Sequence, residues 1–265
     1  GAGNGFGRLI SEKCAAGGAA GVGIDVNADH LDDVVAGIGE AGGQALAQVA
    51  DVTDLAQLKA AATRAVETFG ASDVVVNSAG VMPRADFADH EKAGQRWHQA
   101  IDINIKGVVN GICAVYDQMI AQGRGQVVNI SSIYGNGGIS GAGVYSATKA
   151  AVTAISDALR VETQGRIKVT TVKPTGVFGT NLAGGIVNQI AIMDLAGQNG
   201  PLFAGNLSNL MSGTLRPEQT DVDSVQYWLI TPDDLADAVV HVIDQPWGIS
   251  LSDVTVRASG ENYTR

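Results

Sequence analysis

The chain has 265 residues, 45% of them hydrophobic and 35 of them glycine, which predicts a single α/β domain over 1–265 with a large core. Its formal net charge of −10 argues against nucleic acids and anionic membranes as partners. No apolar run approaches the ~18 residues that a membrane span needs, and no secretory signal is visible.

Cysteine and histidine usage argues against metal chemistry. Cys14 and Cys113 lie in separate helical patterns, and neither they nor the 4 histidines have the spacing of metal ligands. We expect two buried thiols in a cytoplasmic protein, because a reducing compartment keeps thiols free.

The first stretch is glycine-rich. Gly1, Gly5 and Gly7 give the spacing G-x-x-x-G-x-G before a helical pattern over 8–16. Such a loop lets the backbone approach a pyrophosphate and points a helix N-terminus at it. A disordered glycine-rich terminus is the alternative. The strand and helix patterns that follow favour a dinucleotide site.

A short buried strand over 19–25 ends in Asp25, about twenty residues after the glycine loop. This carboxylate would accept hydrogen bonds from ribose hydroxyls and repel a 2′-phosphate. At an effective dielectric of 20, two unit charges ~4 Å apart interact by ~4 kcal/mol. No Arg or Lys stands beside Asp25 to receive a phosphate, so NAD is favoured over NADP. The alternative is a solvated Asp at the start of the next helix (29–39), where Asp29 already supplies a cap.

A second βα unit follows, with a strand over 44–50 and a helix over 54–69. Asp51 and Val52 at their junction would flank an adenine, the Asp by a polar contact and the Val by an apolar one. The next buried strand, 73–77, runs into a turn of small residues that would let the backbone pass close to a ligand.

A long helix over 97–121 contains Asn104. An Asn inside a helix is unfavourable by a few tenths of a kcal/mol, roughly, so its presence needs a reason. It either serves the chemistry or is satisfied by a neighbouring strand, and these two interpretations are compatible.

The most informative stretch joins a strand over 125–131 to a helix over 143–162. In that helix Tyr145 and Lys149 lie at i and i+4 on one face, which places an ammonium beside a phenol. A phenol titrates near pH ~10, and a neighbouring cation favours the phenolate, as a general base requires. Ser132, at the carboxyl end of the strand, could hydrogen-bond the same substrate oxygen. Alone, the pair could arise by chance and the serine could be a cap or turn residue.

The last third predicts a strand over 166–173, a helix over 232–243 and a short strand over 251–256. Between them, residues 181–230 are predicted to form a substrate lid within the domain. Its part 181–215 is strongly apolar, with Asp194 the only charge. A subunit contact is the alternative to a lid over a hydrophobic substrate.

Together these motifs resemble the ordinary branch of the short-chain dehydrogenase/reductase family. The resemblance covers nearly the whole chain and rests on Gly1-Ala-Gly-Asn-Gly-Phe-Gly7, Asp25, Asp51-Val52, Asn77-Ser-Ala-Gly80, Asn104-Ile-Lys-Gly107, Ser132, Tyr145 with Lys149, and Pro174-Thr-Gly-Val177.

The resemblance implies a doubly wound, Rossmann-like parallel sheet that binds a dinucleotide across the carboxyl ends of its strands. It also implies a homodimer or homotetramer, and a hydrophobic central strand ahead of the glycine loop, which we expect to precede Gly1. In the family a glycine follows the proline of the nicotinamide turn, whereas Thr175 stands here and the usual threonine falls one place late, at Thr180. We therefore expect that turn to differ locally.

The implied catalytic set is Ser132, Tyr145 and Lys149, with Asn104 holding through its main chain a water that relays protons. The predicted cofactor contacts are Gly1, Asn4, Gly5, Phe6, Asp25, Asp51, Val52, Asn77, Ala79, Gly80, Tyr145, Lys149, Pro174, Gly176, Val177 and Thr180. The predicted substrate contacts are Ser132, Tyr134, Ile139, Tyr145 and Thr175.

The sequence thus predicts an NAD-dependent enzyme that reversibly oxidises a neutral, hydrophobic secondary alcohol, with Tyr145 as general acid and base. The alternatives are an NADPH-dependent carbonyl reductase and a catalytically silent NAD-binding sensor or scaffold. Asp25 disfavours the reductase, and the complete set of catalytic side chains disfavours the sensor.

Overall fold

The computed structural model describes residues 1–189, 191 and 195–264. Its strands are β1 (Ala20–Asp25), β2 (Gln44–Val49), β3 (Val74–Asn77), β4 (Gly125–Ile130), β5 (Ile167–Pro174) and β6 (Asp253–Val256). Its α-helices are α1 (Gly5–Ala16), α2 (Ala28–Glu40), α3 (Leu55–Phe69), α4 (His90–Ile101), α5 (Gly107–Gln122), α6 (Gly143–Glu162), α7 (Gly200–Ser212), α8 (Pro217–Thr220) and α9 (Pro232–Ile243).

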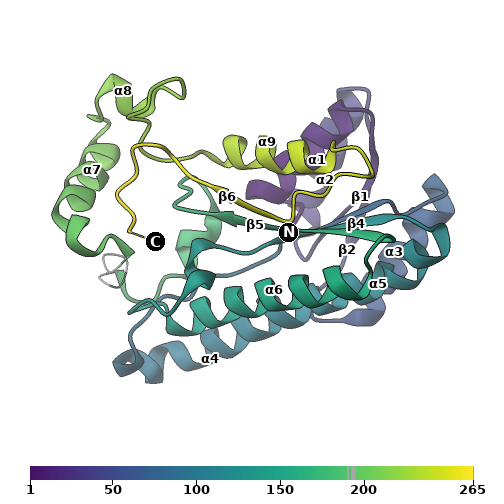
Figure 1. Cartoon of the computed structure of the whole chain (residues 1–265), viewed down its shortest axis with the longest axis horizontal. Coiled ribbons are helices and arrows are strands. Elements are labelled where there is room, and N and C mark those ends of the chain that lie inside the picture. The colour runs from purple at the N-terminus through teal and green to yellow at the C-terminus, as the bar shows by residue number, and fades with distance from the viewer. Residues whose placement is uncertain (190, 192–194, 265) are drawn as a thin grey trace.

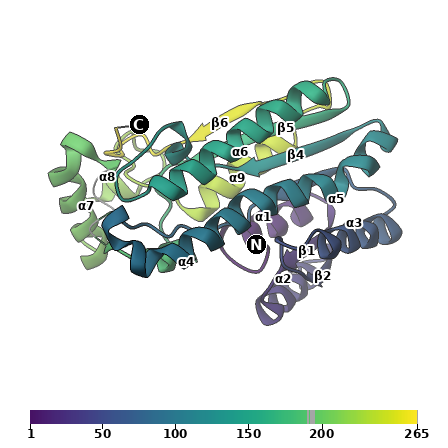
Figure 2. The ribbon, with the colours of Figure 1, turned by 90° about the horizontal axis from the view of Figure 1, so that it is seen from below.

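The strands form a parallel sheet between two layers of helices. β1 pairs with β2, and β3, β4, β5 and β6 pair in that order, every pair being parallel. Helices α1, α2 and α9 cover one face, and α3, α4, α5 and α6 cover the other (Figures 1 and 2). The predicted doubly wound α/β fold is confirmed.

The two central strands show why this sequence folds as layers. β4 is buried along its whole length, and successive side chains of a strand point to opposite faces. Val127 and Val169 pack in the cluster that includes Val152 of α6, whereas Val128 and Val172 pack in the cluster formed with α1 and α9. The valines of these two strands therefore supply a hydrophobic core on both sides of the sheet.

β1 and β3 are not hydrogen-bonded to each other. Between them lies a cavity of about 580 Å³, whose lining includes residues 19–24 and 73–77 from the two facing edges. Unpaired strand edges are costly to leave open. The cavity lies where the sequence predicts a further central strand, and that strand stays a prediction.

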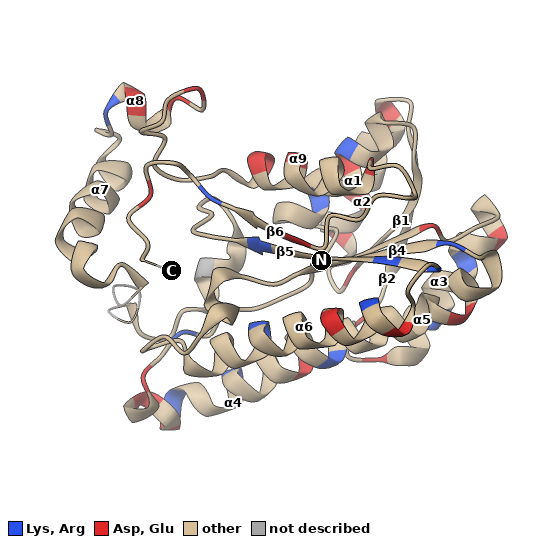
Figure 3. Ribbon diagram, in the orientation of Figure 1, with Lys and Arg blue, Asp and Glu red and all other residues tan. Residues whose placement is uncertain are grey.

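Residues 181–230 contain short 3₁₀ turns, η4 (Asn181–Gly185) and η6 (Gly197–Asn199), followed by α7 and α8. In this segment residues 190 and 192–194, with the predicted charge Asp194, lie outside the described residues. Helix α7 lies beyond the carboxyl ends of the strands (Figure 1), and Figure 3 shows it free of charged residues. Its Phe203 is buried against Trp228, while Met211 is exposed. The assignment of this segment as a substrate lid stays a prediction.

Two details differ from the sequence-based expectations. Cys113 is exposed, because it lies on the outer side of α5, and Cys14 is half-buried. The helix expected over 29–39 begins at Ala28, and its cap is Asn27, whose side chain accepts the His30 amide at 2.9 Å. Among the described residues, no helix is both long and apolar enough to cross a membrane.

Candidate active site

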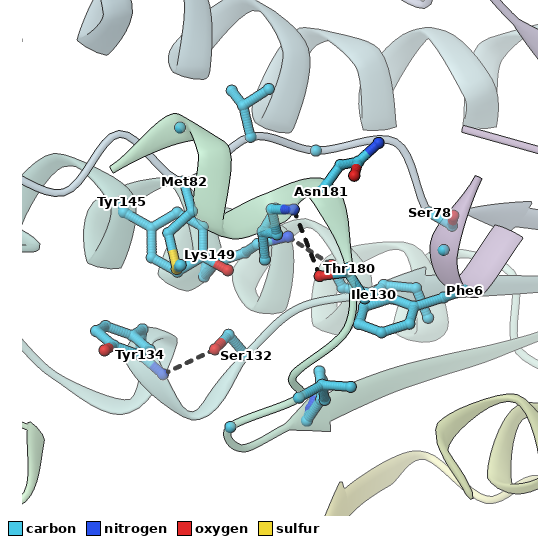
Figure 4. A pocket seen from close by; sticks show the side chains of 18 of the residues that line it. Phe6, Ser78, Met82, Ile130, Ser132, Tyr134, Tyr145, Lys149, Thr180 and Asn181 are labelled. Atoms are coloured by element: carbon cyan, nitrogen blue, oxygen red, sulfur yellow. Dashed lines mark hydrogen bonds between the residues drawn. The ribbon is translucent and has the colours of Figure 1, made fainter. Parts of the chain in front are cut away.

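A cavity of about 540 Å³ opens at the carboxyl edge of the sheet. One end is lined by the glycine loop and Asp25, and the other by Ser132, Tyr145 and Lys149. Figure 4 shows Tyr134, Tyr145, Ser132 and Lys149 gathered in this cavity, with Phe6 and Ser78 on the far side. The structure therefore joins the predicted dinucleotide loop and the predicted catalytic residues in one site.

The glycine loop forms a tight cradle at the N-terminus of α1. A Cβ added to Gly7 would lie 2.0 Å from the carbonyl oxygen of Gly1, so only glycine fits there. Asn4 caps α1, its side chain accepting the Gly5 amide at 2.6 Å. A glycine-only cradle at a helix N-terminus has the shape and partial charge that a pyrophosphate requires, so these residues fit a dinucleotide.

Asp25 lies beside this cradle at the end of β1. Its carboxylate oxygens accept the amides of Gly3 and Asn27, each at 3.0 Å. Burial raises the pKa of Asp25, but the two amide donors and the Gly1 ammonium, 3.3 Å from Oδ2, together outweigh burial. The net shift of the pKa is downward, so the group is an anion at neutral pH. The described cationic side chains that line the cavity are those of Arg84 and Lys149, which lie near Tyr134 and Tyr145.

Ser132, Tyr145 and Lys149 are brought together by β4 and α6. All three are buried, and the Lys149 ammonium lies 5.7 Å from the centre of the Tyr145 ring. Lys149 Nζ donates to the carbonyl oxygen of Ile130 at 2.8 Å, which fixes it at the end of β4. Ser132 Oγ accepts the amide of Tyr134 at 3.2 Å. The i, i+4 geometry expected from the sequence is present.

The structure does not show the expected lowering of the Tyr145 pKa. Burial raises the pKa of this phenol above its ordinary value of 10.0, and the nearby Ser132 hydroxyl and Arg84 guanidinium only partly offset burial. The spacing of Tyr145 and Lys149 indicates a neighbouring cation, whereas the loss of solvent around the phenol depends on the folded structure. At neutral pH the Tyr145 hydroxyl is protonated in this structure.

The buried Lys149 should make the free energy of unfolding depend on pH. Burial lowers its pKa from 10.5 to about 8, so the folded protein binds fewer protons than the unfolded chain between those values. The destabilising effect of the buried charge is present below pH 8 and is relieved as the pH rises toward 10.5. Relative to Lys149→Met, the wild type should gain about 3 kcal/mol in free energy of unfolding across this window. Urea unfolding at several pH values tests it, and parallel pH profiles for the two proteins would refute it.

Asn104 lies in a π-helical turn, η2 (Asp102–Lys106), between α4 and α5. Its side chain accepts the amide of Val81 and donates to the Val81 carbonyl, both at 2.9 Å, and it also donates to Thr148 Oγ1 at 3.1 Å. The side chain thus ties the α4–α5 junction to the loop after β3 and to α6. This turn interrupts the helix that the sequence predicts over 97–121, and a role of Asn104 in proton relay stays a prediction.

Four predicted contacts do not line this cavity. Asp51 Oδ1 accepts the amide and hydroxyl of Thr53, and Val52 packs against Gly107. Asn77 donates to the Asn129 side chain at 2.8 Å, joining β3 to β4. Ile139 belongs to the core cluster behind Tyr134 and Tyr145. The structure does not place these four among the cavity-lining residues. The remaining predicted cofactor contacts line it: Gly1, Asn4, Gly5, Phe6, Asp25, Ala79, Gly80, Tyr145, Lys149, Pro174, Gly176, Val177 and Thr180.

The turn after β5 carries the unusual Thr175. Its hydroxyl donates to Glu261 Oε2 at 2.5 Å, and Arg257 Nε donates to Glu261 Oε1 at 2.6 Å. Burial raises the pKa of Glu261, although these two donors oppose the shift. Thr175 therefore fastens the turn to the C-terminal segment, which a glycine at this position could not do.

Replacing Thr175 by Val should lower the free energy of unfolding by ~1–2 kcal/mol, because it leaves a partly buried carboxylate without one of its donors. Urea denaturation measures the loss. The same substitution in a Glu261→Gln background should cost less than it does alone, and equal costs in the two backgrounds would show that the contact carries no energy.

Sequence reasoning missed further lining residues, namely Met82, Arg84, Ile186, Leu195, Phe203 and Tyr263. They come from loops, α7 and the C-terminal segment, where no periodicity reports which side chains face a ligand. One of them, Arg84 in the loop after β3, is a charged side chain that is only 1% exposed. Within the described part of the chain, no group of three His, Cys, Asp or Glu side chains could hold a metal ion.

Fold and site together define an oxidoreductase built to bind a nicotinamide dinucleotide. Residues 1–191 match the family model for short chain dehydrogenases. The chain belongs to the short-chain dehydrogenase/reductase family, whose members act on small molecules with such a cofactor.

Two relatives and one solved structure illustrate the match. An uncharacterised oxidoreductase of Listeria innocua is 30% identical over 259 residues, covering 97% of this chain and 93% of the relative. A 2,5-dichloro-2,5-cyclohexadiene-1,4-diol dehydrogenase of Sphingobium indicum is 35% identical over 178 residues, covering 67% of this chain and 70% of the relative. The structure of an alcohol dehydrogenase from the archaeon Thermococcus sibiricus, complexed with 5-hydroxy-NADP, has a TM-score of 0.75 at 20% identity, covering 98% of this chain and 94% of that chain.

Proposed function

We propose that this protein is an NAD-dependent dehydrogenase that reversibly oxidises a neutral, hydrophobic secondary alcohol to a ketone. The observation that carries the proposal is the single cavity that runs from the glycine cradle and Asp25 to Ser132, Tyr145 and Lys149. A dinucleotide site alone would suit a sensor, whereas a buried proton-transfer group at the end of that site suits chemistry.

The chain's own residues supply binding and proton transfer. When bound, the dinucleotide would supply the hydride acceptor for the carbinol carbon, and its positive charge would favour the phenolate of Tyr145. In the oxidation direction the phenolate form of Tyr145 would take the hydroxyl proton, while Ser132 orients the substrate oxygen. In the reduction direction the neutral phenol, which is the form favoured at neutral pH, would return that proton. Lys149 holds the nicotinamide ribose, and Asn104 supports the passage of protons to solvent.

The choice of NAD rests on Asp25. Its carboxylate is an anion at the end of β1, and the described cationic side chains that line the cavity lie near the opposite end. A 2′-phosphate would therefore meet repulsion without a compensating cationic side chain. Solved structures of similar fold bind NADP or its derivatives, so this preference concerns the residues of this chain and not its fold.

The choice of a hydrophobic alcohol rests on the cavity wall, which includes Met82, Ile186, Leu195 and Phe203. The likeness to a cyclohexadiene-diol dehydrogenase supports cyclic secondary alcohols as the first substrates to try. The assembly into a homodimer or homotetramer, and the cytoplasmic location, stay predictions.

The test is NADH formation by the full-length protein, followed at 340 nm, with aliphatic, cyclic, aryl and steroidal secondary alcohols. NAD and NADP are run in parallel. Turnover with NAD on at least one alcohol is the expected result. Tight NAD binding without turnover on any alcohol or, in the reverse direction, any matching ketone would support a sensor instead.

A further inference from the structure

Two phenols besides Tyr145 line the substrate end of the cavity. Tyr134 comes from the 3₁₀ turn η3 (Ile133–Asn136), and Tyr263 comes from the C-terminal segment after β6. The rings of Tyr134 and Tyr145 meet edge to face with their centres 5.4 Å apart, and Tyr263 packs against the same cluster. Figure 4 shows Tyr134 beside Tyr145 and Ser132.

Neither extra hydroxyl has a hydrogen-bond partner among the described residues, and both side chains border the cavity. Tyr227 shows the contrast, because its hydroxyl donates to Asp234 at 2.7 Å. Tyrosine hydroxyls in buried positions normally find a partner, so these two, which open toward one cavity, await an oxygen that the described residues do not supply.

Both groups are neutral donors at physiological pH. Burial raises the pKa of Tyr134 to about 12, and it raises the pKa of Tyr263 as well. The Arg84 guanidinium, whose Cζ lies 5.1 Å from the centre of the Tyr134 ring, lowers both values without offsetting burial. A neutral phenol suits a hydroxyl or carbonyl oxygen, to which it can donate a hydrogen bond.

Tyr263 is held in place although it lies near the end of the chain. The neighbouring Asn262 is buried, and its Oδ1 accepts Trp228 Nε1 at 2.7 Å and Asn206 Nδ2 at 3.1 Å. The Thr175–Glu261 hydrogen bond fixes the other side. Tyr263 itself stacks at a tilt on Phe203, with ring centres 5.5 Å apart. Such support lets a loop residue keep the position that recognition requires.

We propose that the Tyr134 and Tyr263 hydroxyls bind a second oxygen of the substrate, which is therefore a diol or hydroxyketone with an apolar body. This inference rests on the proposed function, in which Ser132 and Tyr145 bind the reacting oxygen. The apolar body would lie against Met82 and Leu195, which border the same end of the cavity. A simple monoalcohol would leave both phenols without a partner, and sites of this kind reject such analogues.

The experiment compares kcat/KM for cyclohexanol, the cyclohexane-1,2-, 1,3- and 1,4-diols, and 4-hydroxycyclohexanecarboxylate, all with NAD. In the wild type at least one diol should exceed cyclohexanol by about 10- to 100-fold, as expected for a buried hydrogen-bonding site. In Tyr134→Phe and Tyr263→Phe this ratio should fall about tenfold each, and the double variant should show no preference. Tyr116→Phe, a half-buried tyrosine of α5 outside the cavity, is the matched control and should keep the wild-type ratio.

Several results would overturn the second-oxygen site. These are equal turnover of cyclohexanol and all the diols, a preference for the hydroxy acid, and a diol preference that survives in the double variant. Absence of turnover with every probe would instead count against the proposed dehydrogenase. In that case calorimetry on the NAD-loaded protein decides, because the site requires a diol to bind more tightly than cyclohexanol and to lose that advantage in Tyr263→Phe.

Discussion

Tyr145→Phe should lower kcat by about 10²- to 10⁴-fold while NAD binding is retained, because it removes the phenol oxygen that takes the substrate proton. The ring stays, so the edge-to-face contact with Tyr134 and the packing around Ile133 and Ala142 are preserved. NADH formation at saturating alcohol measures kcat, and calorimetry measures the dissociation constant of NAD.

Tyr116→Phe is the control for this substitution as well, since it deletes a hydroxyl from a tyrosine on α5 that packs against the hydrophobic core. It should keep turnover and stability near the wild-type values. A Tyr145→Phe enzyme that retains turnover within about tenfold of the wild type would remove Tyr145 from the role of general base.

Asp25→Asn should reduce the preference for NAD over NADP, measured as the ratio of kcat/KM values, by about 10²-fold. The ~4 kcal/mol interaction at an effective dielectric of 20 sets an upper limit near 10³-fold, and screening by salt lowers it. Asparagine has almost the same shape as aspartate, but its one carbonyl oxygen can accept only one of the two amides, Gly3 and Asn27, that Asp25 accepts with different oxygens.

Asp29→Asn provides the matched control, because Asp29 is an exposed carboxylate in the first turn of α2, close in sequence to Asp25. It removes the same charge from the same region without touching the cavity and should leave the cofactor ratio unchanged. An Asp25→Asn protein with the wild-type ratio, or a wild type that prefers NADP, would contradict the assignment of NAD.

The sheet and its catalytic residues could be predicted because their signals are local. β4 and β5 are buried β-branched runs, and the positions of Tyr145 and Lys149 on one face follow from helix geometry alone. Ser132 follows β4 directly, so the strand fixes its place. The positions of these side chains follow from the geometry of the strand or helix that carries them.

The remaining parts depend on contacts between distant segments. Arg84, Phe203 and Tyr263 meet in the cavity from three separate segments, and no spacing in the sequence records that meeting. The predicted direction of the Tyr145 pKa shift is wrong for the same reason, since burial by distant elements outweighs the nearby charges. Asp51 and Val52 have the expected motif but lie outside the cavity, because Val52 packs against α5 at Gly107.

The structure explains why Thr175 departs from the family pattern. By sequence it is only a threonine in place of a glycine, and its partner Glu261 lies 86 residues further along the chain. Its hydroxyl fastens the turn after β5 to the segment that presents Tyr263. The threonine at position 175 therefore helps to fix the substrate end of the site as well as the turn after β5.

The central claim is hydride transfer from a secondary carbinol carbon to NAD at the Tyr145 end of the cavity. The most direct measurement uses a cyclohexane-diol deuterated at its carbinol carbons and analyses the reduced cofactor by mass spectrometry and NMR. We expect one deuterium per NADH, located at C4 of the nicotinamide ring. Tyr145→Phe should form deuterated NADH only in proportion to its residual turnover. NADH without deuterium, or no reduced cofactor with any deuterated diol or monoalcohol, would contradict it.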